Sequence, residues 1–141
     1  MEGKVTISVL QESHEGSAGN DWKYQLEVKV FNRGLQGQGV IEVAKHNLPS
    51  GTTQAPPGPP APVEIPIGDS SNDIKVKFRL EAHEVDLFRN DVGVTDIDLN
   101  LACPQPGEEP LVLERDISVG VSDSGRDSVV TLGIRLVLSC D

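Results

Sequence analysis

Residues 73–101 decide the fold and read D-I-K-V-K-F-R-L-E-A-H-E-V-D-L-F-R-N-D-V-G-V-T-D-I-D-L-N-L. In the first third, apolar residues alternate with charged ones, a period of two that is typical of a strand with one face in a core. Its apolar positions are Ile74, Val76, Phe78 and Leu80. The last third alternates again, with one break in phase near Thr95 and apolar positions at Val94, Ile97, Leu99 and Leu101. The stretch therefore predicts two strands.

A short loop dense in oxygen ligands is expected between these strands. It carries Glu84, Asp86, Asn90 and Asp91, and Gly93 follows where a turn needs it. Two strands that present an acidic loop at one end favour a binding edge rather than a catalytic cleft.

The rest of the chain continues the pattern of short alternating runs. The 141 residues fit one domain, 1–141, with 37% hydrophobic but only 4% aromatic residues, so the core must be mostly Val, Leu and Ile. Further strands are expected at 4–11, 22–31, 40–46, 63–67, 111–121 and 128–139, with loops at 12–21 and 34–39. We expect an all-β, eight-stranded antiparallel sandwich. Its expected core includes Tyr24, Leu26, Val28, Ile74, Val76, Phe78, Leu132, Ile134 and Leu136.

Residues 47–62 contain A-P-P-G-P-P-A-P and are predicted to form an exposed surface loop, because proline cannot donate to a sheet ladder. A ligand for a proline-recognising domain is the functional alternative, but no basic residue flanks the segment.

Charge excludes some functions. The formal net charge of −10 is the wrong sign for binding nucleic acid and for unaided adsorption to an anionic membrane, although a bound cation could reverse the field at one edge. The chain shows neither a signal-peptide pattern nor an apolar run long enough to span a bilayer. We expect a cytoplasmic domain in which Cys103 and Cys140, although they could pair, stay reduced. Whether the chain is a piece of a larger multidomain protein is left open.

Catalytic motifs are not found. None of the three histidines sits in a nucleophilic triad motif, the two cysteines are not at zinc spacing, and an EF-hand loop starting at Asp86 would have Asp91 where glycine is required. The chain is expected not to be an enzyme. A calcium site of another kind is still compatible with the sequence, because hard cations bind carboxylate and carbonyl oxygens. Judged from spacing alone, an ordinary acidic turn is the leading interpretation.

Residues 63–99 resemble the second half of a C2 domain, in the motif Glu84-x-Asp86, Asp91, Val92-Gly93 and a closing Leu99. The segment Asp21-x-x-Tyr24-x-Leu26-x-Val28 is similar to part of that family's first half. The resemblance implies an eight-stranded sandwich with calcium ligands at one end. Carried over residue by residue, these ligands are Asp21, Glu84, Asp86 and Asp91.

The match to the family's calcium loops is degenerate. Glu84 stands where the family has Asp, the loop from Asp86 to Asp91 is one residue short, and only Glu12 or Glu15 could replace a second acid of the first loop. Calcium binding is therefore expected to be weak, on the order of 10⁻⁴–10⁻³ M.

The resemblance also implies surfaces for lipid. Leu87 and Phe88 lie where C2 domains place membrane-inserting groups, and Lys75, Lys77 and Arg79 form a basic face like some headgroup patches. We expect a non-enzymatic C2-like module that docks on a phospholipid membrane surface or a protein partner, cytoplasmic or peripherally membrane-associated. The alternative is a calcium-independent scaffolding sandwich for protein–protein interaction.

Overall fold

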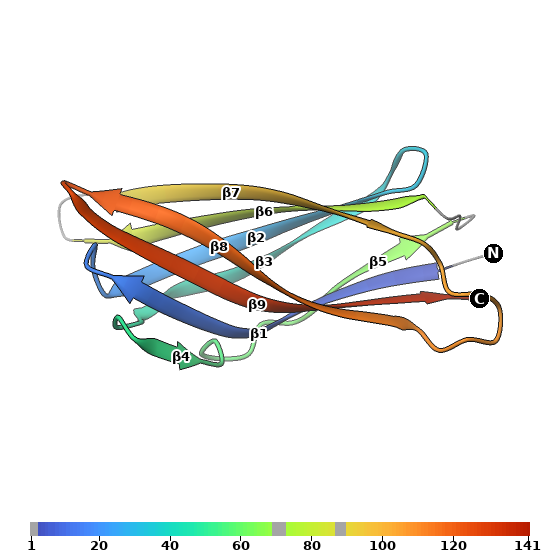
Figure 1. Cartoon of the computed structure of the whole chain (residues 1–141), viewed down its shortest axis with the longest axis horizontal. Coiled ribbons are helices and arrows are strands. Elements are labelled where there is room, and N and C mark those ends of the chain that lie inside the picture. The colour runs from blue at the N-terminus through green and yellow to red at the C-terminus, as the bar shows by residue number, and fades with distance from the viewer. Residues whose placement is uncertain (1–2, 69–72, 87–89) are drawn as a thin grey trace.

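A computed structural model describes residues 3–68, 73–86 and 90–141 and has the expected all-β architecture: two antiparallel sheets packed as a sandwich (Figure 1). The strands are β1 (Gly3–Gly16), β2 (Asp21–Phe31), β3 (Leu35–Asn47), β4 (Thr52–Gln54), β5 (Val63–Ile67), β6 (Ile74–Val85), β7 (Asn90–Leu101), β8 (Leu111–Asp123) and β9 (Arg126–Cys140). Across these three ranges there is no helix long and apolar enough to cross a membrane.

The two sheets explain why nine strands occur where eight were expected. One sheet has the order β3-β2-β6-β7, and the other has the order β4-β1-β9-β8 with β5 also paired to β1. Strand β4 pairs with Glu12–His14 of β1, whereas β5 pairs with Gly3–Ile7. Two short strands, β4 and β5, thus share the edge position beside β1. Each sheet is four strands wide, and the shared edge brings the total to nine.

The core lies between the sheets and is largely aliphatic. All nine core residues predicted from the alternation are at most 3% exposed. Burial of each large apolar side chain contributes about 1.5–3 kcal/mol, which makes the alternating faces the main source of stability.

The β6–β7 hairpin keeps an unbroken register from the pair Ile74–Leu101 to the pair Val85–Asn90. The predicted break in phase near Thr95 is wrong. Thr95 stays on the half-buried side, in phase with Asp91 and Leu101, and Val94 is 43% exposed. Asn90 and Asp91, expected in the loop, belong to β7 itself. Because the phase is unbroken, Asp91 is directed toward the space between the sheets.

Strand β1 runs five residues further than expected, so residues 12–16 are strand rather than loop. Its pairing with β9 shifts between Val9 and Gln11. This bulge inserts one residue and leaves Leu10 37% exposed, so that the inward phase moves to Glu12 and His14, both fully buried. Glu12 and His14, which were predicted to lie in a loop, therefore line the interior.

Strand β3 begins at Leu35, so the turn predicted over 34–39 is also wrong. Gly37 and Gly39 serve close packing, because a Cβ at either position would overlap Ile65 or Val63 of β5. Segment 47–62 is largely exposed, but the expectation fails for three parts of it. Leu48 is completely buried and residues 52–54 form β4. Pro56, within the proline run, is buried as well.

A disulfide joins Cys103 to Cys140, so the expectation of reduced thiols is wrong for this structure. Cys103 follows the end of β7 and Cys140 ends β9, which places their Cα atoms 5.9 Å apart, within bonding range. The sequence separation of 37 residues gave no hint of this proximity.

Candidate metal centre

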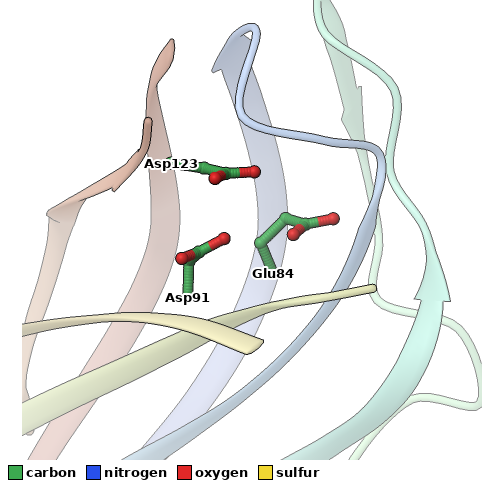
Figure 2. Close-up of side chains that lie close together, drawn as sticks. All are labelled: Glu84, Asp91 and Asp123. Atoms are coloured by element: carbon green, nitrogen blue, oxygen red, sulfur yellow. The ribbon is translucent and has the colours of Figure 1, made fainter. Parts of the chain in front are cut away.

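Three carboxylates meet at the end of the sandwich opposite the chain termini (Figures 1 and 2). Glu84 near the end of β6 and Asp91 near the start of β7 occupy directly opposed ladder positions. Asp123 ends β8 and belongs to the other sheet. One carboxylate oxygen from each residue lies within 4.8 Å of the other two.

Glu84 is the most unusual member of this acidic cluster of Glu84, Asp91 and Asp123. Its side chain is only 4% exposed, and its Oε2 atom has no hydrogen-bond partner. Burial raises the pKa of Glu84, and the negative charges of Asp86, Asp91, Asp123 and Asp21 raise it further. A buried carboxylate that lacks a donor and faces like charges is costly unless a positive charge compensates it.

The β1–β2 loop closes one side of the cluster. A Cβ at Gly19 would overlap the Glu84 carboxylate, so glycine allows the loop to lie directly against it. The loop is held there by the fully buried Trp22, whose Nε1 donates to Gly19 O at 3.1 Å. Ser17 N also donates to Asp127 O at 3.0 Å, which ties the loop to β9.

Of the four ligands implied by the C2 resemblance, the structure brings Glu84 and Asp91 into the cluster. Asp21 and Asp86 lie near enough for their charges to act on Glu84, but they are not part of the three-oxygen group. Asp86 is exposed and Asp21 is half-buried, so both face the solvent side of this end. Leu87 and Phe88, the expected lipid contacts, lie outside the described residues.

Asp123 was missed by the sequence reasoning. It belongs to the run S-D-S-G-R-D, which reads as an ordinary turn, and it is nonetheless 9% exposed. The β8–β9 hairpin reverses at this same end of the sandwich, and only the packing of the two sheets brings it to Glu84. An acid at the tip of a second hairpin was the available signal.

Glu12 and Glu15, the substitutes considered for a second acid of the first loop, are not part of the cluster. Glu15 is exposed, and Glu12 is fully buried in a separate network. Glu12 accepts hydrogen bonds from Tyr24 Oη at 2.6 Å and from Gln54 Nε2 at 2.9 Å, and it lies 2.7 Å from His46 Nε2. Its carboxylate is satisfied and has a structural role.

The basic face implied by the resemblance lies on the outer side of β6 and is mixed in charge. Arg79 pairs with Asp96 at 3.4 Å, and Lys77 lies 5.5 Å from the centroid of the Phe31 ring. Lys75 is half-buried beside them. Acidic side chains thus interrupt the row of positive charge.

The donor set of the acidic cluster fits a hard divalent cation. Calcium binds oxygens at about 2.3–2.6 Å, so two oxygens on one ion are at most roughly 5 Å apart. The three carboxylate oxygens, all within 4.8 Å of one another, satisfy this condition. Carboxylates without thiolate or imidazole suit calcium or magnesium rather than zinc or copper. The unsatisfied Glu84 oxygen is the group that such an ion would compensate.

Fold and site together define an all-β sandwich domain with a carboxylate-lined end. Neither a family model nor a curated protein sequence matches the chain. A solved structure described by the words "CC2D1B coordinates ESRCT-III activity during the mitotic reformation of the nuclear envelope" resembles it with a TM-score of 0.51 and 13% identity. The match covers 98% of this chain and 62% of that one. At this identity the likeness supports the sandwich fold alone.

Proposed function

We propose that this domain is a non-enzymatic, C2-like interaction module that binds a divalent cation, calcium, at its acidic end and uses it to dock on an anionic membrane surface. The observation that carries this proposal is Glu84, a buried carboxylate whose Oε2 has no hydrogen-bond partner, in a group of three convergent carboxylates. Burying an ionised carboxylate is costly unless hydrogen-bond donors, a proton or a positive ion compensate its charge, and a cation would compensate all three carboxylates at once.

In this proposal Glu84, Asp91 and Asp123 hold the ion from the protein side. A calcium ion takes six to eight oxygens, so three carboxylates leave coordination positions for water or for a phosphate of the partner. Asp21 and Asp86 border the solvent side and add negative charge around the opening. With a net charge of −10 the free protein is repelled by anionic lipid, and bound cations would reduce that repulsion locally.

Co-sedimentation with vesicles that contain phosphatidylserine, with calcium or with EDTA, tests the docking. Calcium should promote binding of the wild-type protein, and Glu84→Gln should abolish this effect. Asp98→Asn is a matched control, because Asp98 is an exposed acid on β7 away from the cluster. Equal binding with calcium and with EDTA, or none in either, would count against calcium-dependent docking.

The C2 resemblance implies two further surfaces that could contact lipid. If Leu87 and Phe88 insert into lipid, Phe88→Ala should reduce vesicle binding while the affinity for calcium is retained. If the basic face contributes, replacing Lys75 and Lys77 by Gln should reduce binding and weaken its dependence on salt concentration.

A cation-independent scaffold for protein partners is the second candidate function. Val92 and Val94 are 49% and 43% exposed on β7, and the structural neighbour is described by the words "coordinates ESRCT-III activity". If the partner is a protein of the ESRCT-III named in that description, Val92→Asp should abolish its binding in EDTA, whereas Glu84→Gln should not. If the purified proteins do not bind at all, this candidate fails.

A further inference from the structure

The two sheets meet edge to edge along β7 and β8, which lie in contact but belong to different sheets. We call this line of contact the seam. At Gly93 the backbone of β7 comes so close to β8 that a Cβ would overlap Gly120 O. No ladder joins β7 to β8 in the described sheets, so side chains and close packing must hold the seam.

One end of the seam is fastened covalently. The disulfide between Cys103 and Cys140 ties the chain just after β7 to the last residue of β9, the neighbour of β8. The acidic cluster lies at the other end, where β7 begins and β8 ends (Figure 1). The seam is therefore closed by a covalent bond at one end, and three carboxylates converge at its other end.

We propose that the cation bound at the acidic end is a clasp between the sheets: Asp123 from the β8–β9 hairpin ligates the same ion as Glu84 and Asp91 from the β6–β7 hairpin, and the ion closes the seam. This inference rests on the proposed cation site and adds its structural consequence. Cation binding controls how firmly the β8–β9 hairpin is held on the opposite sheet.

Three observations support the clasp. One carboxylate oxygen from each of the three residues lies within 4.8 Å of the other two, although the residues come from both sheets, and Figure 2 shows the three side chains together. Glu84 is 96% buried with an unpartnered Oε2, so a charge-compensating group belongs in this position rather than bulk water. Asp123 is 9% exposed at the end of a strand, where a hairpin aspartate is ordinarily solvated.

Without the ion, three like charges oppose closure of the seam; with it, each carboxylate gains a ligand bond to a shared centre. The ion should therefore protect the backbone amides of the β8–β9 hairpin more strongly than those of β3, which has no part in the seam.

Hydrogen exchange with and without calcium, together with calorimetric titration, tests the clasp on the whole chain. In the wild-type protein, saturating calcium should slow amide exchange in residues 119–128 about tenfold or more, and exchange in β3 should change little. Asp123→Asn should weaken calcium binding about tenfold or more and remove this protection. Asp116→Asn is the matched control, because Asp116 is an exposed acid on the same strand, and it should behave like the wild type.

The outcomes separate the clasp from the proposed function. If calcium binds the wild-type protein but exchange in residues 119–128 is unchanged, or if Asp123→Asn binds calcium with wild-type affinity, the clasp is wrong and the cation site remains. If calcium does not bind at all, both proposals are overturned. The wild-type exchange experiment decides the question even if Asp123→Asn fails to fold.

Discussion

Glu84 on β6 and Asp123 on β8 belong to different sheets, yet a carboxylate oxygen of one lies within 4.8 Å of a carboxylate oxygen of the other. Both side chains are buried, and Asp91 lies equally close. Folding therefore brings negative charges together in a place where water cannot fully solvate them. We therefore expect the acidic end to lower the stability of the cation-free domain and a cation bound there to raise it.

Glu84→Gln should stabilise the cation-free domain at neutral pH by about 1–3 kcal/mol, because it removes a poorly compensated buried charge. The pKa of Glu84 is raised by burial first and then by the surrounding carboxylates. The glutamine amide can donate to neighbouring carboxylates, so the substitution creates no new unsatisfied acceptor. Urea denaturation in EDTA measures the change in the free energy of unfolding. A loss of stability would show that the Glu84 carboxylate is already compensated.

Gly19→Ala should lower the affinity for calcium, since the added methyl group overlaps the Glu84 carboxylate and displaces it from the cluster. We expect roughly a tenfold loss, comparable to removing one ligand. Calorimetric titration measures the affinity, and circular dichroism checks that the sandwich persists. Gly68→Ala is the control, because nothing lies near a Cβ at that position. Wild-type affinity in Gly19→Ala would mean that Glu84 is not a ligand.

Tyr24 should make the domain sensitive to alkali. Burial, the hydrogen bond to Glu12 and the charge of Glu12 all raise the pKa of Tyr24 far above its ordinary value. In the unfolded chain the phenol ionises near pH 10, so this contribution to stability is fully present below about pH 10 and is lost as the pH rises above it. Since the chain has one tyrosine, phenolate absorbance should appear only together with unfolding. A phenolate signal from the folded domain near pH 10 would contradict the buried placement.

Reduction of the disulfide should cost about 3–4 kcal/mol of stability, because Cys103 and Cys140 close a loop of 37 residues in the unfolded chain. Denaturation of the oxidised protein and of a variant carrying Cys103→Ser and Cys140→Ser measures this difference. We expect the reduced domain to remain folded, since the core does not depend on the bond. Equal stability of the two forms would show that the bond constrains the unfolded chain little.

Much of the fold follows from simple alternation. The strands in 73–101 and the core around Leu26, Phe78 and Leu132 were predicted because a period of two specifies one buried face. The bulge in β1 was not predictable, because a single extra residue changes the phase without changing the composition. As a result Glu12 and His14 read as loop residues, although both are buried.

The acidic site was predictable only in part. Glu84 and Asp91 face each other across one hairpin, so local sequence was sufficient to pair them. Asp123 is 32 residues beyond Asp91 in the chain and reaches the cluster through sheet packing, so its place at the tip of a second hairpin was the single hint in the local sequence. Pairing of Cys103 with Cys140 was left possible and reduced thiols were favoured, because it is the packing of the chain that brings the two cysteines together.

Calcium titration followed by thermal unfolding is the most direct test of the central claim that the acidic end binds a divalent cation. The single, buried Trp22 reports on this end, because its indole donates to Gly19 beside Glu84. With a dissociation constant on the order of 10⁻⁴–10⁻³ M, ~10 mM calcium should raise the melting temperature by roughly 3–10 °C in the wild-type protein. Glu84→Gln should show no such rise. A melting temperature of the wild-type protein that calcium leaves unchanged, or an equal rise in Glu84→Gln, would contradict the account.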